Sequence, residues 1–180
     1  MRMSTVTAPT GEGPYYIAGT AQLTGGELNY TDLPGDPIKI VGHVYSGADT
    51  SKPLAGAKIE IWQADSDGFY HPEGNGDIGK YDPNQIALRG YVLTHGAGAF
   101  QFTSIYPGHY WGRTRHIHVR VSAPGHGGMF TQIIVPAKPG DDTIPENDMI
   151  ARYLPQANYV TFRDDNGVRT AGFDFFIAAD

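Results

Sequence analysis

Short segments in which apolar residues alternate with polar ones, or in which β-branched and aromatic residues dominate, recur along the chain. In Lys58-Ile59-Glu60-Ile61 the alternation is strict, so one face of this segment is expected to be buried and the other wet. Gly, Pro, Asp or Asn flanks most of these segments, as is typical of strands that end in turns. The predicted strands are Ile38–Tyr45, Ala57–Gln63, Leu88–Thr94, Ala99–Thr103, His116–Ser122, Met129–Pro136, Asn158–Arg163 and Val168–Ile177. They predict an all-β fold, a two-sheet antiparallel β-sandwich.

The connections between these strands are expected to carry function. Asp65–Ala87 is long for a β-protein, and long ordered loops are often functional. Ser104–Arg115 is shorter but dense in Tyr, His, Trp and Arg. A third connection, Ala137–Gln156, shows no recognisable chemistry but contains the only helix that the pattern predicts, about Glu146–Leu154 between two prolines. No repeat or linker interrupts the chain, so residues 1–180 are expected to form a single domain.

Composition supports a folded protein and removes several classes of function. The 180 residues are 40% hydrophobic and 18% charged, which excludes a disordered tail. The net charge is −6 and there is no basic run, which argues against nucleic acid as a partner. The absence of Cys excludes disulfides, thiolate metal sites and a Cys nucleophile.

The chain also shows no sign of a membrane segment. No run of about 18 consecutive apolar residues occurs, so no membrane span is expected. Met1 to Gly13 contains no apolar core of a signal peptide, which predicts a cytoplasmic protein; secretion stays open if a leader has been removed.

His116-Ile117-His118 is the sharpest chemical feature of the sequence. Residues i and i+2 of a strand point to the same face, so the two imidazoles are expected to project together and Ile117 toward the core. Such a pair suits zinc, copper and iron equally well, and two half-exposed histidines on a wet face are an equally simple interpretation. The other five histidines stand singly and are expected to be exposed or hydrogen-bonded.

Further motifs follow one another in order from about Gly11 to Pro136. They are Gly13-Pro14-Tyr15-Tyr16, Trp62-Gln63-Ala64-Asp65 with Gly68-Phe69-Tyr70, Leu88-Arg89-Gly90, Gly98-Ala99-Phe100-Gln101-Phe102, Pro107-Gly108-His109-Tyr110, Arg113-Thr114-Arg115-His116-Ile117-His118 and Thr131-Gln132. In these motifs and their order the chain resembles the intradiol ring-cleavage dioxygenases, the family of catechol 1,2-dioxygenase and protocatechuate 3,4-dioxygenase. It resembles a minimal member made of the sandwich alone, without the helical N-terminal region of the catechol 1,2-dioxygenases.

The resemblance implies an enzyme that opens the ring of a small aromatic diol between its two hydroxylated carbons with O₂, giving a muconate-type diacid. It implies a non-haem Fe(III) cofactor and association into a homo-oligomer. The implied metal ligands are Tyr70, Tyr110, His116 and His118. Tyr110 would also take a proton from the substrate, while Arg113 stabilises developing negative charge and Gln132 supports the site. The implied substrate pocket includes Pro14, Tyr15 and Tyr16.

Charge balance is compatible with this ligand set. Two phenolates and one hydroxide cancel the three positive charges of Fe(III), and a neutral site is cheaper to bury than a charged one. Zinc with the same ligands would leave a net negative site. Two alternatives stay open at this point: a non-catalytic, transthyretin-like β-sandwich that binds a ligand, and a zinc hydrolase. The zinc hydrolase lacks an obvious third ligand and an activating Glu beside the His pair.

Overall fold

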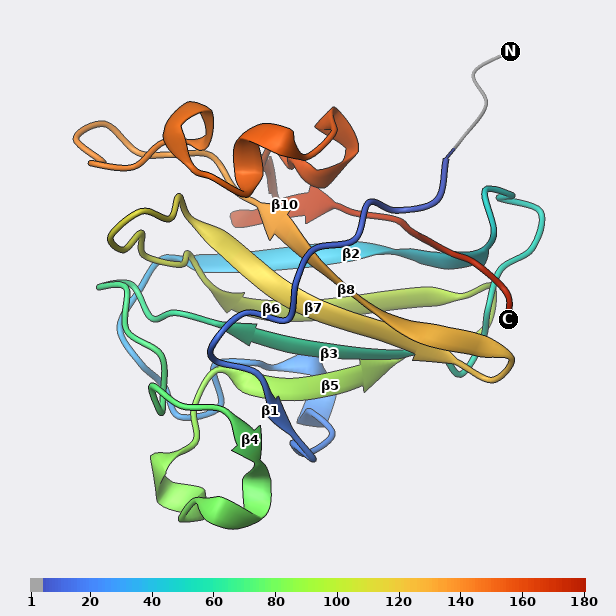
Figure 1. Ribbon diagram of the computed structural model, residues 1–180, viewed down its shortest axis with the longest axis horizontal. Helices are drawn as coiled ribbons and strands as arrows, with labels where there is room; N and C mark the ends of the chain where they lie inside the picture. Colours follow the sequence, from blue (N-terminus) through green and yellow to red (C-terminus); the bar gives the residue numbers. More distant parts are fainter. Residues whose placement is uncertain (1–4) are drawn as a thin grey trace.

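Two β-sheets packed face to face form the body of the molecule, as predicted (Figure 1). The computed structural model describes residues 5–180. One sheet has the strand order β5-β3-β7-β8; in the other, β2 lies between β6 and the pair β10 and β11, with β9 beyond β10. The strands of the sandwich are β2 (Pro37–Ser46), β3 (Lys58–Gln63), β5 (Arg89–Leu93), β6 (Ala99–Ile105), β7 (His116–Ala123), β8 (His126–Ile134), β9 (Arg163–Asp165), β10 (Val168–Gly172) and β11 (Phe175–Ile177).

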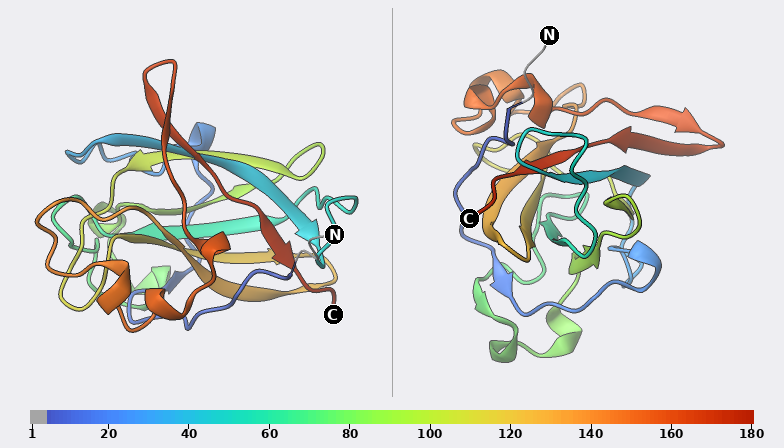
Figure 2. Two further views of the ribbon diagram at one scale, coloured as in Figure 1. Left: turned by 90° about the horizontal axis from the view of Figure 1, so that it is seen from above. Right: turned by 90° about the vertical axis from the view of Figure 1, so that its right-hand side faces the viewer.

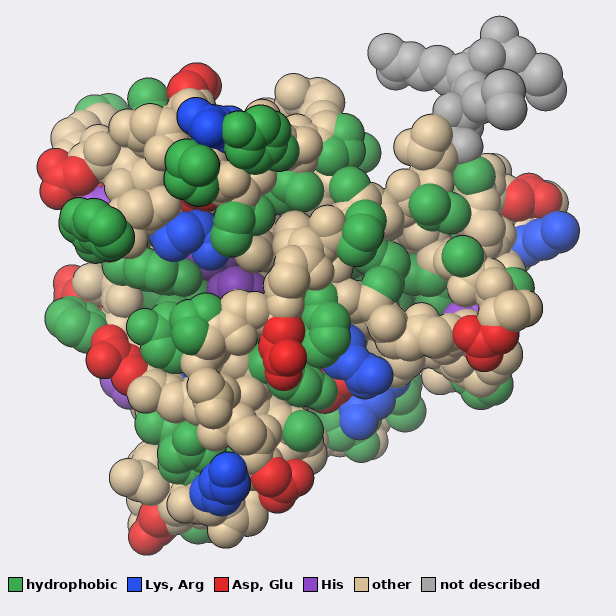
Figure 3. All heavy atoms as spheres, in the orientation of Figure 1, with side chains coloured by type: hydrophobic (Ala, Val, Ile, Leu, Met, Phe, Trp, Pro, Cys, Tyr) green, Lys and Arg blue, Asp and Glu red, His purple; other side chains and the backbone are tan. Residues whose placement is uncertain are grey.

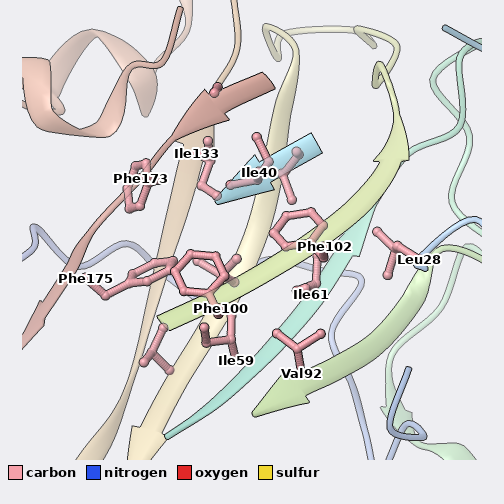
Figure 4. Close-up of a cluster of buried hydrophobic side chains, with 14 of the residues drawn as sticks. Leu28, Ile40, Ile59, Ile61, Val92, Phe100, Phe102, Ile133, Phe173 and Phe175 are labelled. Carbon is pink, nitrogen blue, oxygen red and sulfur yellow. The ribbon is translucent and has the colours of Figure 1, made fainter. Parts of the chain in front are cut away.

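The core lies between the two sheets and is built from alternate residues of each strand. Ile40 and Phe102 from one sheet face Ile59 and Ile61 from the other (Figure 4), and each is at most 1% exposed. Burying such a side chain stabilises the fold by about 1.5–3 kcal/mol. On β7 the core-facing residues are Ile117, Val119 and Val121. The alternate residues of this strand, His116 and His118 among them, therefore point to the outer face of the four-stranded sheet.

Not every strand pair is antiparallel, contrary to the prediction. β10 and β11 both run parallel to β2, at successive registers, because the long connection after β8 brings the chain back to the same end of the sheet. The predicted strand Val168–Ile177 is broken where Phe173 N donates to Val41 O and Asp174 accepts a hydrogen bond from His43 N. The β9–β10 hairpin stands out from the body in both views of Figure 2.

The predicted helix over Glu146–Leu154 was wrong. Two separate 3-10 turns, Pro145–Asn147 and Ala151–Tyr153, replace it. Between them, the Asp148 side chain accepts hydrogen bonds from Ile150 N and Ala151 N, and so competes with a continuous helix. The other 3-10 turns are Thr24–Gly26, Ile78–Lys80, Pro83–Gln85 and Gln156–Asn158. Within residues 5–180, no helix is long and apolar enough to cross a membrane.

The predicted strand over Asn158–Arg163 was also largely wrong, since β9 only begins at Arg163. A small addition was not predicted: β1 (Ile17–Ala18) pairs in parallel with β4 (Gly76–Asp77) beside the sandwich. The segment that leads into β1 crosses the outer face of the four-stranded sheet (Figure 1), held by the hydrogen bond from Thr10 N to Phe130 O. This covering segment turns the outer face into an enclosed site.

Candidate metal centre and active site

β7 places two imidazoles side by side on the covered outer face. His116 and His118 are each 1% exposed, and their Nε2 atoms lie 3.0 Å apart. Burial, followed by the positive charge of Arg113, lowers the pKa of His116 to about 3. Burial and the neighbouring His116 likewise lower the pKa of His118 well below its usual value. Both imidazoles are therefore neutral near pH 7, the state in which a His can bind a metal.

Neighbouring groups fix the direction of both rings. His116 Nδ1 donates to Thr114 O at 2.6 Å, which leaves Nε2 as the unprotonated nitrogen. Trp62, directly opposite on β3, stacks flat on His118 with ring centroids 5.1 Å apart and planes inclined by 4°. On the other side, β8 places Gln132 opposite His118.

Two tyrosine hydroxyls from different loops face the His pair. Tyr70 follows β3, and Tyr110 lies between β6 and β7. Their Oη atoms are 3.0 Å apart and lie 3.4 Å and 3.1 Å, respectively, from His116 Nε2. Burial raises the pKa of both tyrosines. An ionised tyrosine at this place therefore needs a strong positive charge beside it.

Close backbone packing brings the two tyrosine loops together. A Cβ on Gly108 would lie 2.4 Å from Gly68 N, and a Cβ on Gly68 would lie 2.3 Å from His109 O. Gly108 N donates to Asp65 O, and the Asp65 carboxylate accepts from backbone N–H groups of its own loop and lies 2.7 Å from His71 Nε2. Only glycine at these two positions allows the contact.

Arg113 is held beside the two tyrosine hydroxyls and the His pair by a carboxylate and an amide. Its Nε donates to Asp148 Oδ2 at 3.0 Å, and its Nη2 donates to Gln132 Oε1. Asp148 is fully buried and also accepts from three backbone N–H groups, those of Thr114, Ile150 and Ala151. Burial acts to raise the pKa of Asp148, but these hydrogen bonds and Arg113 outweigh it and lower the pKa. The carboxylate is therefore ionised near pH 7.

Asp148 lies in the connection that showed no chemistry in the sequence. Only its capping role could have been predicted from the local sequence, because an Asp two or three residues before the first N–H groups of a turn often accepts hydrogen bonds from them. No local sequence pattern indicates its pairing with Arg113, which lies 35 residues earlier in the chain.

A buried arginine lies behind Tyr70 and was not predicted as part of the site. Arg89 is 2% exposed and donates to His71 O at 3.0 Å, to Pro72 O at 2.8 Å and to Tyr15 O. Its guanidinium carbon is 5.9 Å from the centre of the Tyr70 ring. Burial lowers the pKa of Arg89 to about 10, so its charge is retained at pH 7. Arg89 thus joins the covering segment to the loop of Tyr70.

Tyr70, Tyr110, Arg113 and Gln132 border a cavity of about 650 Å³. Figure 3 shows the hollow on this face, with a His side chain visible at the bottom and hydrophobic side chains around it. The cavity is lined by Gly11, Gly13, Pro14, Tyr15, Gly68, Phe69, Tyr70, Glu73, Tyr110, Trp111, Arg113, Gln132 and Ile150. Tyr15 stacks on Tyr70 with ring centroids 4.3 Å apart. Tyr16 is not among the lining residues, because it turns toward Trp62 and donates to Glu60 at 2.8 Å.

Comparison with known proteins identifies the family. A family model described as Dioxygenase matches residues 11–179, nearly the whole chain. The chain belongs to the intradiol ring-cleavage dioxygenase family. Hydroxyquinol 1,2-dioxygenase of Nocardioides simplex is 30% identical over 148 residues, which cover 72% of this chain and 47% of that protein. Catechol 1,2-dioxygenase 2 of Acinetobacter lwoffii is 32% identical over 155 residues, covering 74% and 52%. The chain spans about half the length of these intradiol relatives.

One solved structure aligns with this chain over almost the full length of both proteins. It is the dioxygenase domain of a dioxygenase carbohydrate-binding protein fusion from Streptomyces sp. SirexAA-E, 31% identical, with a TM-score of 0.75 over 97% of this chain and 99% of that one. An intradiol ring-cleavage dioxygenase from Tetranychus urticae is 24% identical, with a TM-score of 0.80 over 97% and 95% of the chains, and shows the same fold.

The two tyrosine hydroxyls and the two imidazoles are a donor set that fits the non-haem Fe(III) implied by membership of the intradiol family. His116 Nε2 lies 3.0–3.4 Å from both tyrosine oxygens and from His118 Nε2, and the two tyrosine oxygens lie 3.0 Å apart, which is the spacing of neighbouring ligands around one ion. Phenolate is a hard anion suited to the ferric ion. Within residues 5–180, no group of three or more His, Cys, Asp or Glu side chains could hold a metal.

Proposed function

We propose that this protein is a non-haem Fe(III) dioxygenase that opens the ring of a catechol-type diol between its hydroxylated carbons, with O₂ as the second substrate. The observation that carries the proposal is the convergence of two tyrosine hydroxyls and two neutral imidazoles at one cavity, in a chain of the intradiol family. The product would be a muconate-type diacid. Nothing in the described residues favours the alternative of a non-catalytic sandwich, since all four donor side chains are present and close together, three of them buried and Tyr110 half-buried.

Tyr70, Tyr110, His116 and His118 would hold the iron. When bound, Fe(III) supplies the positive charge that keeps both tyrosines ionised and draws electron density from the diol, so that a ring carbon reacts with O₂. The burial that raises the pKa of Tyr70 and Tyr110 also keeps both histidines neutral, so the protein itself adds no positive charge at the four donor atoms.

The two tyrosines have different surroundings and are assigned different roles. Tyr70 is 4% exposed and enclosed between the ring of Tyr15 and Arg89, so it is expected to keep its place through the reaction. Tyr110 is only half-buried and lies on a loop that borders the cavity. Tyr110 Oη is therefore assigned as the base that takes a proton from the bound diol.

Arg113 and Gln132 line the cavity and are assigned to charge stabilisation. The guanidinium of Arg113 is fixed in advance by Asp148 and Gln132, so no reorganisation is needed when negative charge develops on the substrate. Asp148 acts through Arg113 and is a positioning residue. Pro14 and Tyr15 also line the cavity, where they would orient the ring and limit access of water.

The proposal is tested by oxygen uptake of the iron-loaded protein with catechol, hydroxyquinol and protocatechuate, together with mass analysis of the products. We expect diacids with both atoms of O₂ incorporated. The His118→Ala variant should neither bind iron nor take up oxygen, whereas His95→Ala, in a turn between β5 and β6, should behave as the parent does. A semialdehyde product from cleavage outside the diol, or no uptake by protein that contains iron, would overturn the proposal.

Association into a homo-oligomer and a cytoplasmic location stay predictions from the sequence. Light scattering of the purified protein tests the first, and fractionation of the source cells tests the second.

A further inference from the structure

The mouth of the cavity is unusually rich in exposed apolar side chains. Trp111 is 97% exposed, Phe69 is 57% exposed and Ile150 is 36% exposed, and all three line the cavity. They come from three segments that are far apart in sequence: the loop of Tyr70, the loop of Tyr110 and the connection after β8. Exposed apolar side chains that gather at one place, rather than singly, mark a binding surface.

We propose, on the basis of the proposed function, that the preferred substrate is a catechol bearing a large, neutral, apolar extension such as a second aromatic ring. The diol end reaches the four proposed donor atoms, and Trp111, Phe69 and Ile150 bind the extension at the mouth. These three side chains are thus specificity-determining residues, and they leave the assigned catalytic groups unchanged.

The size of the cavity supports an extended substrate. Its volume of about 650 Å³ lies within the range of roughly 300–1,000 Å³ that is typical of sites for drug-sized ligands. A single ring with two hydroxyls fills only part of such a space. The unfilled part lies toward the mouth, because the floor is closed by the buried pair Tyr70 and Gln132.

The charges of the lining favour a neutral extension over a carboxylated one. Arg113 is the single cation among the lining residues, and Asp148 and Gln132 already accept its hydrogen bonds. The only acidic lining residue, Glu73, is exposed and would repel a carboxylate. A substrate with a carboxylate on its ring would therefore lose hydration without gaining a free cationic partner. Aromatic and aliphatic groups have no such cost at this mouth.

The first test compares kcat/KM for 4-phenylcatechol with kcat/KM for catechol and protocatechuate, in the iron-loaded protein. We expect a preference for 4-phenylcatechol over both. Trp111→Ala and Phe69→Ala should each lower the ratio of 4-phenylcatechol to catechol by roughly 2- to 12-fold, the effect of removing one aromatic contact. Using a ratio cancels any change in iron content or folded fraction. Tyr153→Ala is the matched control, since Tyr153 is 71% exposed on the same connection as Ile150 but does not line the cavity.

A second measurement does not need catalysis. The chain has two tryptophans, and Trp62 is buried while Trp111 is exposed, so ligand at the mouth should quench the red-shifted emission of Trp111. In metal-free protein, 4-phenylcatechol should quench at lower concentration than catechol, and Trp111→Phe should abolish the signal. The inference would be overturned if the ratio of kcat/KM for 4-phenylcatechol to that for catechol were the same in the parent, Trp111→Ala and Phe69→Ala, or if the parent preferred protocatechuate. Either result would leave the proposed ring opening unaffected. Quenching without any ring opening would support the mouth as a binding site and overturn the proposed function.

Discussion

Tyr70 and Tyr110 show how two identical side chains 3.0 Å apart are given different environments. Tyr70 is fixed from behind by Arg89, whose hydrogen bonds tie together the chain on both sides of the ring. The Tyr110 ring has no such cation behind it, and Tyr110 itself is held by reciprocal backbone hydrogen bonds with Arg113 in the same loop. The difference is one of neighbours and not of residue type.

The tyrosine variants should therefore differ in phenotype. Tyr70→Phe is expected to lose most of the iron and the visible tyrosinate-to-iron(III) absorption, because the enclosed ligand is gone. Tyr110→Phe is expected to retain much of the iron but to turn over about 10²–10⁴-fold more slowly, since a positioned base is lost. Iron content and oxygen uptake are measured on the same samples, with Tyr45→Phe on β2 as the control. Equal iron loss in both variants would contradict the assignment.

Arg113→Ala should separate charge stabilisation from metal binding. The side chain of Arg113 donates to Asp148 and Gln132, and its hydrogen bonds with Tyr110 are made by the backbone. Removing the side chain leaves those backbone bonds in place, so iron content is expected to change little. The rate should fall on the order of 10²–10³-fold, as when one preorganised charge-stabilising group is removed. Arg152→Ala, which removes an exposed cation nearby in the connection after β8, serves as the control. A rate within a few-fold of the parent would show that Arg113 is only part of a structural ion pair.

The residues of the site differ in how far their local sequence revealed them. The common direction of His116 and His118 follows from strand geometry alone, because residues i and i+2 share a face. Arg89 and Asp148 could not be assigned in the same way. Arg89 contacts Tyr15, 74 positions earlier, and Asp148 contacts Arg113, 35 positions earlier. Such pairings are set by how the loops fold over the sheet, and no short pattern encodes them.

At the scale of elements, the central strands were predictable because each buries one alternating face. The errors lie where a side chain or the topology overrides the local pattern. Asp148 divides the predicted helix into two turns. The predicted strand from Val168 to Ile177 contains a break, where β11 replaces β10 as the neighbour of β2. Parallel pairing was also missed, because strand direction depends on the connection and not on the strand.

The contact between the two tyrosine loops gives an element-scale prediction. In Gly108→Ala the added Cβ would meet Gly68 N at 2.4 Å and Ser66 O at 2.7 Å, both of them backbone atoms that cannot rotate away. The loops should separate, and we expect reduced iron binding with the far-UV circular dichroism of the sandwich retained. Gly172→Ala is the control, since its Cβ would meet only Val41 O, at 3.9 Å. Unchanged iron affinity in Gly108→Ala would show that the loops can move without cost to the site.

The connection after β8 is anchored by an acid-sensitive contact. Both oxygens of Asp141 accept hydrogen bonds from Arg115, at 2.7 Å and 2.8 Å, and these lower the pKa of Asp141. A carboxyl whose pKa is lower in the folded state stabilises the fold above its unfolded pKa of about 3.9. That contribution disappears as the pH falls through the folded value.

Asp141→Asn should therefore lower Tm at pH 7, and the gap to the parent should narrow as the pH approaches 3. Thermal unfolding followed from pH 7 to pH 3 measures both effects. Asp142→Asn, an exposed neighbour, should track the parent throughout. A gap of constant size across this range would mean that the carboxylate charge is not what anchors the connection.

At the scale of the whole molecule, the core and the site are physically separate. The main hydrophobic cluster fills the space between the sheets, while Trp62, Tyr70 and the rings packed on them form a second cluster on the outer face. The four-stranded sheet serves both, with alternate residues of β7 facing one or the other. The sandwich should thus fold without the metal, and the site should be completed on a surface that is already rigid.

This separation predicts how metal removal affects stability. Metal-free protein is expected to keep the β-sheet circular dichroism of the loaded form, but with a lower Tm, because an ion that binds only the folded state stabilises it by mass action. At a free Fe(III) concentration 100 times Kd, the gain is about 2.7 kcal/mol, which for a domain of this size corresponds to a rise in Tm of roughly 5–10 °C. His118→Ala should show no such rise with iron, although its own Tm must be compared with and without the ion. Unfolded metal-free protein at 25 °C would show instead that the outer face is needed to hold the two sheets together.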